Sequence, residues 1–300
     1  MGFFGNPVDA VRVSCREPDV ISKYANALSR IGGVKESLED DIRYAMRYLI
    51  DTGASPCSWH EIEAEETRNP LRVQAYKVYY AKSLPRDIEK ATLPKLRILG
   101  FSMIAFSQKG SPKPDKDPVS VIPVVTSDGE KFQFVAKNSD DKPVVEAFIK
   151  CVRDFDPDVI VGYGTNRHDW NYLISRAKRL GLRLLVDRVD TEPHMSVYGH
   201  ISVSGRANVD FYDFADELPE VKVKTLDNVA DFLCVMELGK RTVIEDTDLA
   251  PYWEDLKKRK ALLQFSKENA QSVIGISDKM LDFAMQLSSL VGLPLDHIGT

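Results

Sequence analysis

The chain has 300 residues, of which 43% are hydrophobic and 28% are charged, and this composition is ordinary for a globular protein. Its formal net charge is −5 at pH 7, whereas a domain that grips duplex DNA by itself is usually basic. The sequence has neither the apolar run of about 18 residues that a membrane-spanning helix needs nor the leader of a secreted protein. We therefore expect a cytoplasmic protein with no membrane partner.

The N-terminal part is predicted to contain short elements. Residues 8–16 alternate like a strand, and residues 19–31 and 40–50 show helical spacing and are followed by glycine. We interpret residues 1–55 as a small α+β domain. Residues 56–94 are interpreted as a connecting segment, in which VQAYKVYYAKSL fits either a strand or an amphipathic helix.

From Lys95 onward the sequence alternates between strand and helix patterns. A hairpin and a further strand are expected within MSVYGHISVSGRANVDFYDF. The other predicted strands cover residues 95–107, 120–127, 131–137 and 158–163, and the predicted helices cover residues 143–154, 169–180, 225–235 and 253–291. This order predicts that residues 95–300 form one α/β domain, with a mixed sheet flanked by helices.

One block, FDPDVIVGYGTNRHDWNYL at 155–173, carries a specific signal. It has a turn, a buried strand, a loop and the start of a helix, with Asp169 where the loop becomes the helix. This block resembles the second exonuclease motif of family B DNA polymerases. The segments around it, from FFGNPVDAVRV to LSSLVGLPLDHIGT, are similar in order to the N-terminal half of the archaeal or eukaryotic-type members.

The resemblance implies a fold and partners. Residues 95–300 would form an RNase H-like exonuclease domain, and residues 1–55 would be a remnant of the polymerase N-terminal domain. The remaining polymerase domains would be partners in cis or in trans, because the chain would be a piece of a polymerase or the product of a split gene. The uracil sensing of some family members is not carried over to this chain.

The resemblance also implies a lost chemistry. In the family, four carboxylates from three motifs hold two metal ions, which bind water and the scissile phosphate. The first motif, Asp-x-Glu, falls here on Ser102 and Ile104, and the third, Tyr-x-x-x-Asp, falls on Phe265 and Asn269. Asp169 is the one acid that is kept. We therefore predict an inactivated exonuclease domain that binds no metal and needs no cofactor.

Four residues are candidates for weak contact with single-stranded or primer-template DNA: Asn166, His168, Lys222 and Lys224. Each also has a structural alternative. Asn166 fits a turn cap, His168 fits a surface or packing histidine, and the two lysines fit a solvated loop. Asp169 likewise fits a helix cap or a first-turn acid.

The favoured function is a scaffold or single-strand contact in DNA replication or repair. One alternative is an active 3′–5′ exonuclease that uses Mg²⁺ or Mn²⁺ and recruits Asp210, Asp213 or Asp278. Another is a regulatory subunit that binds a polymerase without touching DNA.

Overall fold

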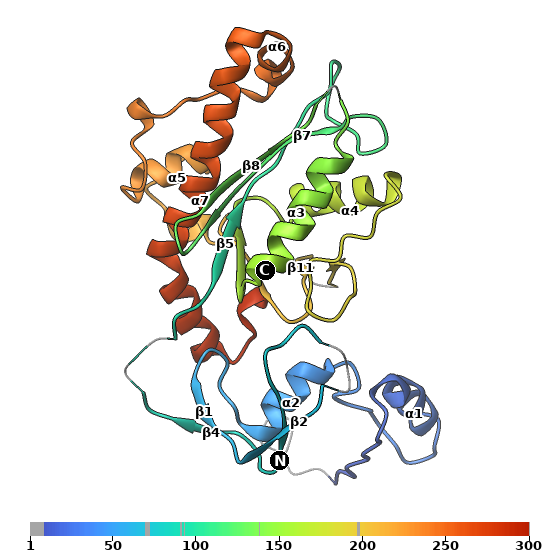
Figure 1. The fold of residues 1–300 in the computed structure, drawn as a ribbon. Helices are drawn as coiled ribbons and strands as arrows, with labels where there is room; N and C mark the ends of the chain where they lie inside the picture. Colours follow the sequence, from blue (N-terminus) through green and yellow to red (C-terminus); the bar gives the residue numbers. More distant parts are fainter. Residues whose placement is uncertain are drawn as a thin grey trace. The chain divides into compact units, whose positions relative to one another are not determined.

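The chain separates into two compact units, Met1–Ala54 and Ser55–Thr300. The computed structural model describes residues 9–69, 73–90, 92, 94–137, 139–196 and 199–299 (Figure 1). In this described part, no helix combines the length and the apolar character that crossing a membrane requires.

The first unit contains short helices. They are η2 (Pro18–Val20), α1 (Ile21–Leu28) and α2 (Tyr44–Thr52), so both predicted helices are present, and α1 ends earlier than expected. The strand predicted over 8–16 is wrong for residues 9–16, which have no regular secondary structure and are exposed throughout; residue 8 lies outside the described residues. An alternating pattern forms a strand only where another strand accepts its backbone hydrogen bonds.

The second unit begins with two antiparallel strand pairs. Strand β1 (Trp59–Glu61) pairs with β4 (Arg86–Ile88), and β2 (Ala64–Thr67) pairs with β3 (Val78–Ala81). Of the two possibilities left open for VQAYKVYYAKSL, its central part therefore forms a strand. The amide of Gln74 donates to the carbonyl of Arg188 at 2.7 Å, so this predicted connecting segment is hydrogen-bonded to the α/β part of the same unit.

A mixed sheet lies at the centre of the second unit, in the order β12-β9-β5-β7, with β6 and β8 also paired to β7. Its strands are β5 (Ile98–Phe101), β6 (Ile104–Ala105), β7 (Val119–Thr126), β8 (Lys131–Val135), β9 (Val159–Gly162) and β12 (Ala207–Asp210). Strands β5, β9 and β12 are parallel, and β7 runs antiparallel to its three partners. The predicted strand over 95–107 is thus interrupted at Ser102 and Met103.

Helices cover both faces of the sheet (Figure 1). Helices α3 (Lys142–Phe155) and α4 (Asp169–Arg179) pack on one face, in a core that includes Phe148 and Trp170. The long helix α7 (Leu256–Val291) packs on the other face, through residues such as Val273. The remaining elements are β10 (His194–Met195), β11 (Ile201–Ser202), η3 (Ala215–Glu217), α5 (Leu226–Phe232), η4 (Leu238–Lys240), η5 (Asp246–Asp248), α6 (Leu249–Glu254) and η6 (Leu295–His297).

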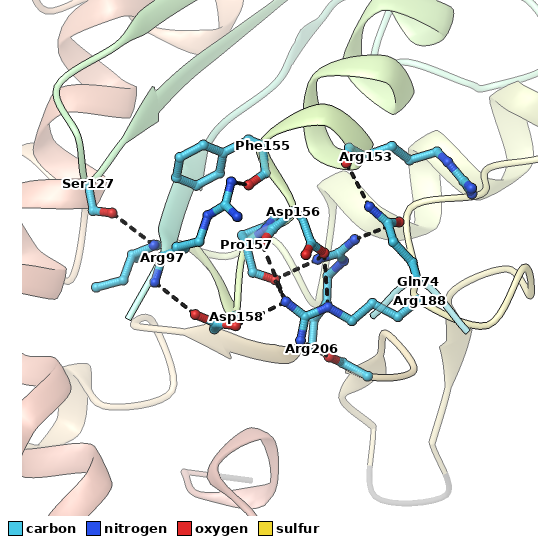
Figure 2. Close-up of polar contacts among 12 residues, drawn as sticks. Gln74, Arg97, Ser127, Arg153, Phe155, Asp156, Pro157, Asp158, Arg188 and Arg206 are labelled. Atoms are coloured by element: carbon cyan, nitrogen blue, oxygen red, sulfur yellow. Dashed lines mark hydrogen bonds and ion pairs between the residues drawn. The ribbon is translucent and has the colours of Figure 1, made fainter. Parts of the chain in front are cut away.

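A partly buried ion-pair network lies at the start of β9 (Figure 2). The carboxylate of Asp156 accepts hydrogen bonds from Arg188 Nε at 2.9 Å and Arg206 Nη1 at 2.6 Å. Burial raises the pKa of Asp156, but the bonds from the two arginines outweigh it and hold this pKa below its usual value. Gln74 lies next to this network. Its side-chain amide donates to the carbonyl of Arg153 at 2.8 Å.

Candidate functional site

The loop between β9 and α4 is folded around one carboxylate. Asp210, at the end of β12, accepts hydrogen bonds from the amides of Gly164 at 2.6 Å and Asn166 at 2.8 Å. A third bond comes from the amide of Tyr212 at 3.0 Å. Burial raises the pKa of Asp210, and these three amides partly offset that effect. Asp210 therefore acts here as a buried anchor for the loop that leads to Asp169.

Glycine is required at the start of this loop. A Cβ at Gly162 would lie 2.2 Å from the side chain of Thr165, which is too close for any side chain. Gly164 has a φ of +75°, a conformation that glycine adopts without strain. The sequence GYG thus allows the chain to turn sharply from β9 and present Asp169 at the first turn of α4.

Asn166 is buried within this loop, with 4% of its surface exposed. Its side-chain oxygen accepts from the amide of Ile201 at 3.2 Å and from Asn208 Nδ2 at 2.8 Å. Its side-chain nitrogen lies 3.5 Å from Asp213. These contacts tie the loop to β11 and β12 and are not the local turn cap named as the alternative; contact of Asn166 with DNA stays a prediction.

Asp169 lies beside the break between β5 and β6. Its carboxylate accepts a hydrogen bond from the backbone amide of Met103. Burial raises the pKa of Asp169 to about 8, with the charge of Asp210 adding to the shift and the Met103 amide opposing it. The fold thus brings Asp169 next to the segment that contains Ser102 and Ile104.

The first-motif positions offer little to a cation. Ser102 donates its amide to the carbonyl of Pro123 at 3.4 Å, and its buried hydroxyl has no hydrogen-bond partner among the described residues. Ile104 is 4% exposed. It packs in an apolar cluster with Val121 and Leu262, and Phe265 of α7 packs against the same cluster. Ile104 and Phe265 have therefore become parts of one hydrophobic core.

Helix α7 approaches β5 closely at Gly100. A Cβ there would lie 3.3 Å from Val273 Cγ1 and 3.4 Å from the backbone nitrogen of Ile274. Asn269 lies one helical turn before Val273. The small residue at position 100 thus lets the helix that carries the third motif pack directly on the strand that leads into the first.

The side chain of Asn269 accepts a hydrogen bond from the guanidinium group of Arg241. Arg241 Nη2 donates to Asn269 Oδ1 at 2.6 Å, and Arg241 Nη1 lies 3.3 Å from the hydroxyl of Ser272. Arg241 is 8% exposed. Burial lowers its pKa, and the charges of Asp227 and Glu268 oppose that shift. No sequence pattern indicates this residue, because an isolated arginine in a loop has no distinctive spacing before the fold brings it to α7.

A match to a protein-family model decides the identity of this fold. Residues 36–229 match the model described as DNA polymerase family B, exonuclease domain. The chain belongs to this family. The match covers the predicted second motif, and it confirms the family that the block at 155–173 suggested.

Relatives of known name agree with this assignment. The chain is 41% identical over 303 residues to DNA polymerase 2 of Aeropyrum pernix, a match that covers 99% of this chain and 37% of that protein. It is 33% identical over 295 residues to the DNA polymerase of Archaeoglobus fulgidus, covering 98% of this chain and 36% of that protein. The chain thus spans a little over a third of the length of these relatives.

A solved structure supports the fold. The family B DNA polymerase from the hyperthermophilic archaeon Pyrobaculum calidifontis matches with a TM-score of 0.88 and 43% sequence identity, over 94% of this chain and 36% of that chain. The prediction of an RNase H-like mixed sheet flanked by helices is therefore confirmed.

The motif positions of this exonuclease domain do not fit a pair of divalent cations. Mg²⁺ is held by carboxylates, other oxygens and water in near-octahedral geometry. Here Ser102 offers a hydroxyl, Ile104 offers no donor atom, and the oxygen of Asn269 already accepts from Arg241. Among these motif positions, Asp169 alone supplies a carboxylate.

The acids named as substitutes each have other contacts or are exposed. Asp210 anchors the loop, and Asp213 lies 3.5 Å from Arg167, with its pKa raised to about 6 by burial and by the charge of Asp210. Asp278 is exposed on α7. Glu268 accepts from the amide of Thr242 at 2.7 Å and from Gln264 at 2.8 Å, so it faces the loop after η4.

The remaining candidates for DNA contact differ in their surroundings. His168 and Lys222 are exposed. Lys224 is half-buried, and its ammonium donates to the carbonyl of Leu218. The carbonyl of Lys224 accepts from the Tyr163 hydroxyl at 2.8 Å. The ammonium of Lys224 thus has an internal partner, and the side chains of His168 and Lys222 are accessible to a ligand.

Proposed function

We propose that this exonuclease domain has lost metal-dependent hydrolysis and serves a family B DNA polymerase as a scaffold and a weak single-strand contact. It would act in DNA replication or repair in the cytoplasm, with the other polymerase domains as its partners. The observation that carries the proposal is the packing of Ile104 and Phe265 in one apolar cluster. Two positions that supply polar groups in the family motifs are here part of the hydrophobic core.

Electrostatics support the loss of the metals. One charge pair at about 4 Å is worth roughly 4 kcal/mol at an effective dielectric constant of about 20. Replacing three of four carboxylates thus removes on the order of 10 kcal/mol of gross attraction, as an upper bound. Arg241 acts in the same direction, because its buried charge at Asn269 repels a cation placed there.

The proposed DNA contact is weak for two reasons. The net charge of −5 opposes the approach of a polyanion. Of the four candidate residues, His168 and Lys222 are exposed, and Asn166 and Lys224 have internal partners. Appreciable affinity would come from the remaining polymerase domains acting together with this one.

The test is a nuclease assay on a 3′-labelled single strand with Mg²⁺ and then with Mn²⁺. We expect the natural chain to shorten the strand no faster than the Asp169→Ala variant does. Because Asp169 is the acid retained from the motifs, the variant is a matched control, and a contaminating nuclease would affect both samples equally. Shortening by the natural chain that Asp169→Ala abolishes would establish the active exonuclease instead.

A binding assay separates the scaffold from the regulatory alternative. Fluorescence anisotropy of a labelled single strand at low salt is expected to show weak, saturable binding. Absence of binding there, together with retained binding to the polymerase domains, would favour a subunit that does not touch DNA.

A further inference from the structure

A second cluster of possible metal ligands lies away from the exonuclease motifs. Among the described residues, His200, Asp296 and His297 have one donor atom each within 4.8 Å of the others. His200 directly precedes β11, and the other two residues belong to η6. Segments far apart in the sequence thus place two imidazoles and a carboxylate together.

Both sides of this cluster are held by the fold. His200 is fully buried, with 0% of its surface exposed, and its Nδ1 lies 3.0 Å from the hydroxyl of Ser196. On the other side, Leu295 and Ile298 flank the pair at 296–297, and both are buried in the core cluster that also contains Phe211. The three donor groups are therefore attached to packed backbone, as a preorganised site requires.

The geometry around His200 matches that of a ligand histidine. A metal-bound imidazole usually has its second ring nitrogen held by a hydrogen bond, which fixes the tautomer and the ring orientation. Ser196 is placed to do this for Nδ1, and Nε2 makes the longer contact, 3.4 Å to Ser202 Oγ, which a metal at Nε2 would replace. The rings of His200 and His297 have their centroids 4.4 Å apart, so the two imidazoles are direct neighbours.

The donor set selects a class of metal. Two imidazoles and one carboxylate, with a fourth position for water, are a common zinc ligand set. Mg²⁺ and Ca²⁺ prefer oxygen ligands, and imidazole favours Zn²⁺, Cu²⁺ and Ni²⁺. This cluster therefore suits a transition-metal ion such as Zn²⁺, whereas the exonuclease motifs of the family suit Mg²⁺.

We propose that His200, Asp296 and His297 form a transition-metal site of the zinc class that links η6 to the start of β11. A metal bound there would cross-link two segments that are otherwise joined by packing and hydrogen bonds. Because a ligand that binds only the folded state stabilises it, the site would raise the stability of the C-terminal part of α7 and η6. This inference is independent of the proposed loss of nuclease activity.

The test is titration of the chelator-treated chain with Zn²⁺ by calorimetry, in a buffer with excess Mg²⁺. We expect one saturable site and a higher melting temperature in the presence of Zn²⁺. Replacement of Zn²⁺ by Co²⁺ is expected to give the visible absorption of a four-coordinate cobalt ion. The same titration monitored by that absorption reports the coordination number of the bound ion.

Variants locate the site. His297→Ala and Asp296→Asn are each expected to weaken Zn²⁺ binding by at least about tenfold; the second is nearly isosteric and preserves folding if the first does not. The matched control is His60→Ala, because His60 Nε2 pairs with Asp87 at 2.8 Å without a second imidazole. Equal affinity in Asp296→Asn and His60→Ala, or no saturable binding by the natural chain, would overturn the proposal.

Discussion

At the scale of single residues, the apolar surroundings of Ile104 make a clear prediction. Ile104→Glu places a carboxylate in a core of Val121, Leu262 and Phe265, which costs several kcal/mol unless the group is neutralised. We expect Ile104→Glu to lower the free energy of unfolding by about 3 kcal/mol or more. Ile104→Val, which only removes a methylene group, should lower it by about 1 kcal/mol.

Urea denaturation of both variants measures this difference. A similar, small loss for Ile104→Glu and Ile104→Val would show that position 104 tolerates a charge, and that the first-motif segment is not part of the core. That outcome would also weaken the proposed loss of nuclease activity.

Asp169 gives a second prediction at this scale, in the pH dependence of stability. Its pKa in the folded chain is raised from 3.8 to about 8, so the folded state binds this proton more tightly than the unfolded state does. The stability that the group contributes is complete below about pH 4 and is lost as the pH rises toward 8. In Asp169→Asn this loss is absent, because the side chain cannot ionise.

The measurement is the free energy of unfolding at pH 5 and at pH 8. Relative to the natural chain, Asp169→Asn should gain at least about 1 kcal/mol on going from pH 5 to pH 8, since one pKa unit corresponds to about 1.4 kcal/mol. An identical difference between the two proteins at both pH values would contradict a raised pKa.

At the scale of elements, the carboxylate of Asp156 stabilises the turn from α3 to β9. Asp156 has a φ of +50°, which asparagine also tolerates, so Asp156→Asn removes the charge and keeps the turn. Arg206, whose side chain has 0% of its surface exposed, would then lose its anionic partner. We expect a loss of about 3 kcal/mol in the free energy of unfolding.

The matched control is Asp154→Asn, in the last turn of α3 and two residues before Asp156. The Asp154 side chain is 62% exposed and pairs with Lys150, and exposed pairs of this kind contribute about 0–1 kcal/mol. Thermal or urea denaturation of the two variants compares them directly. Equal effects would show that the network in Figure 2 adds no more than a surface ion pair.

The elements also show what the sequence could predict. The apolar run before Gly162 and the helical spacing after Asp169 correctly predicted β9 and α4, because the signal of each is local. The break at Ser102 and Met103 was missed, because a single serine within the apolar run ILGFSMIAF does not indicate the end of a strand. The contact of Arg241 with Asn269 was also missed, because it depends on how a loop meets α7.

At the scale of the whole molecule, charge governs the proposed contact with DNA. Each phosphate contact on a single strand contributes a slope of about −0.7 in a plot of log affinity against log salt. Lys222→Ala should make this slope shallower by about 0.7 if the exposed Lys222 contacts one phosphate. Lys150→Ala is the control, because Lys150 lies on the outer surface of α3 and pairs with Asp154.

Fluorescence anisotropy over a range of salt concentrations gives both slopes. Equal slopes for Lys222→Ala and the natural chain would remove Lys222 from the contact. A shallower slope for Lys150→Ala as well would indicate a general effect of net charge rather than a local contact.

The packing of Ile104 against the face of α7 that carries Phe265 has an evolutionary consequence. A substitution that returned one acid to this position would cost folding stability at once, yet by itself it would complete no metal site. On the proposed loss of hydrolysis, regaining that activity would need several coordinated changes, each unfavourable until the last was made. The packed core would then make the activity hard to recover by single substitutions.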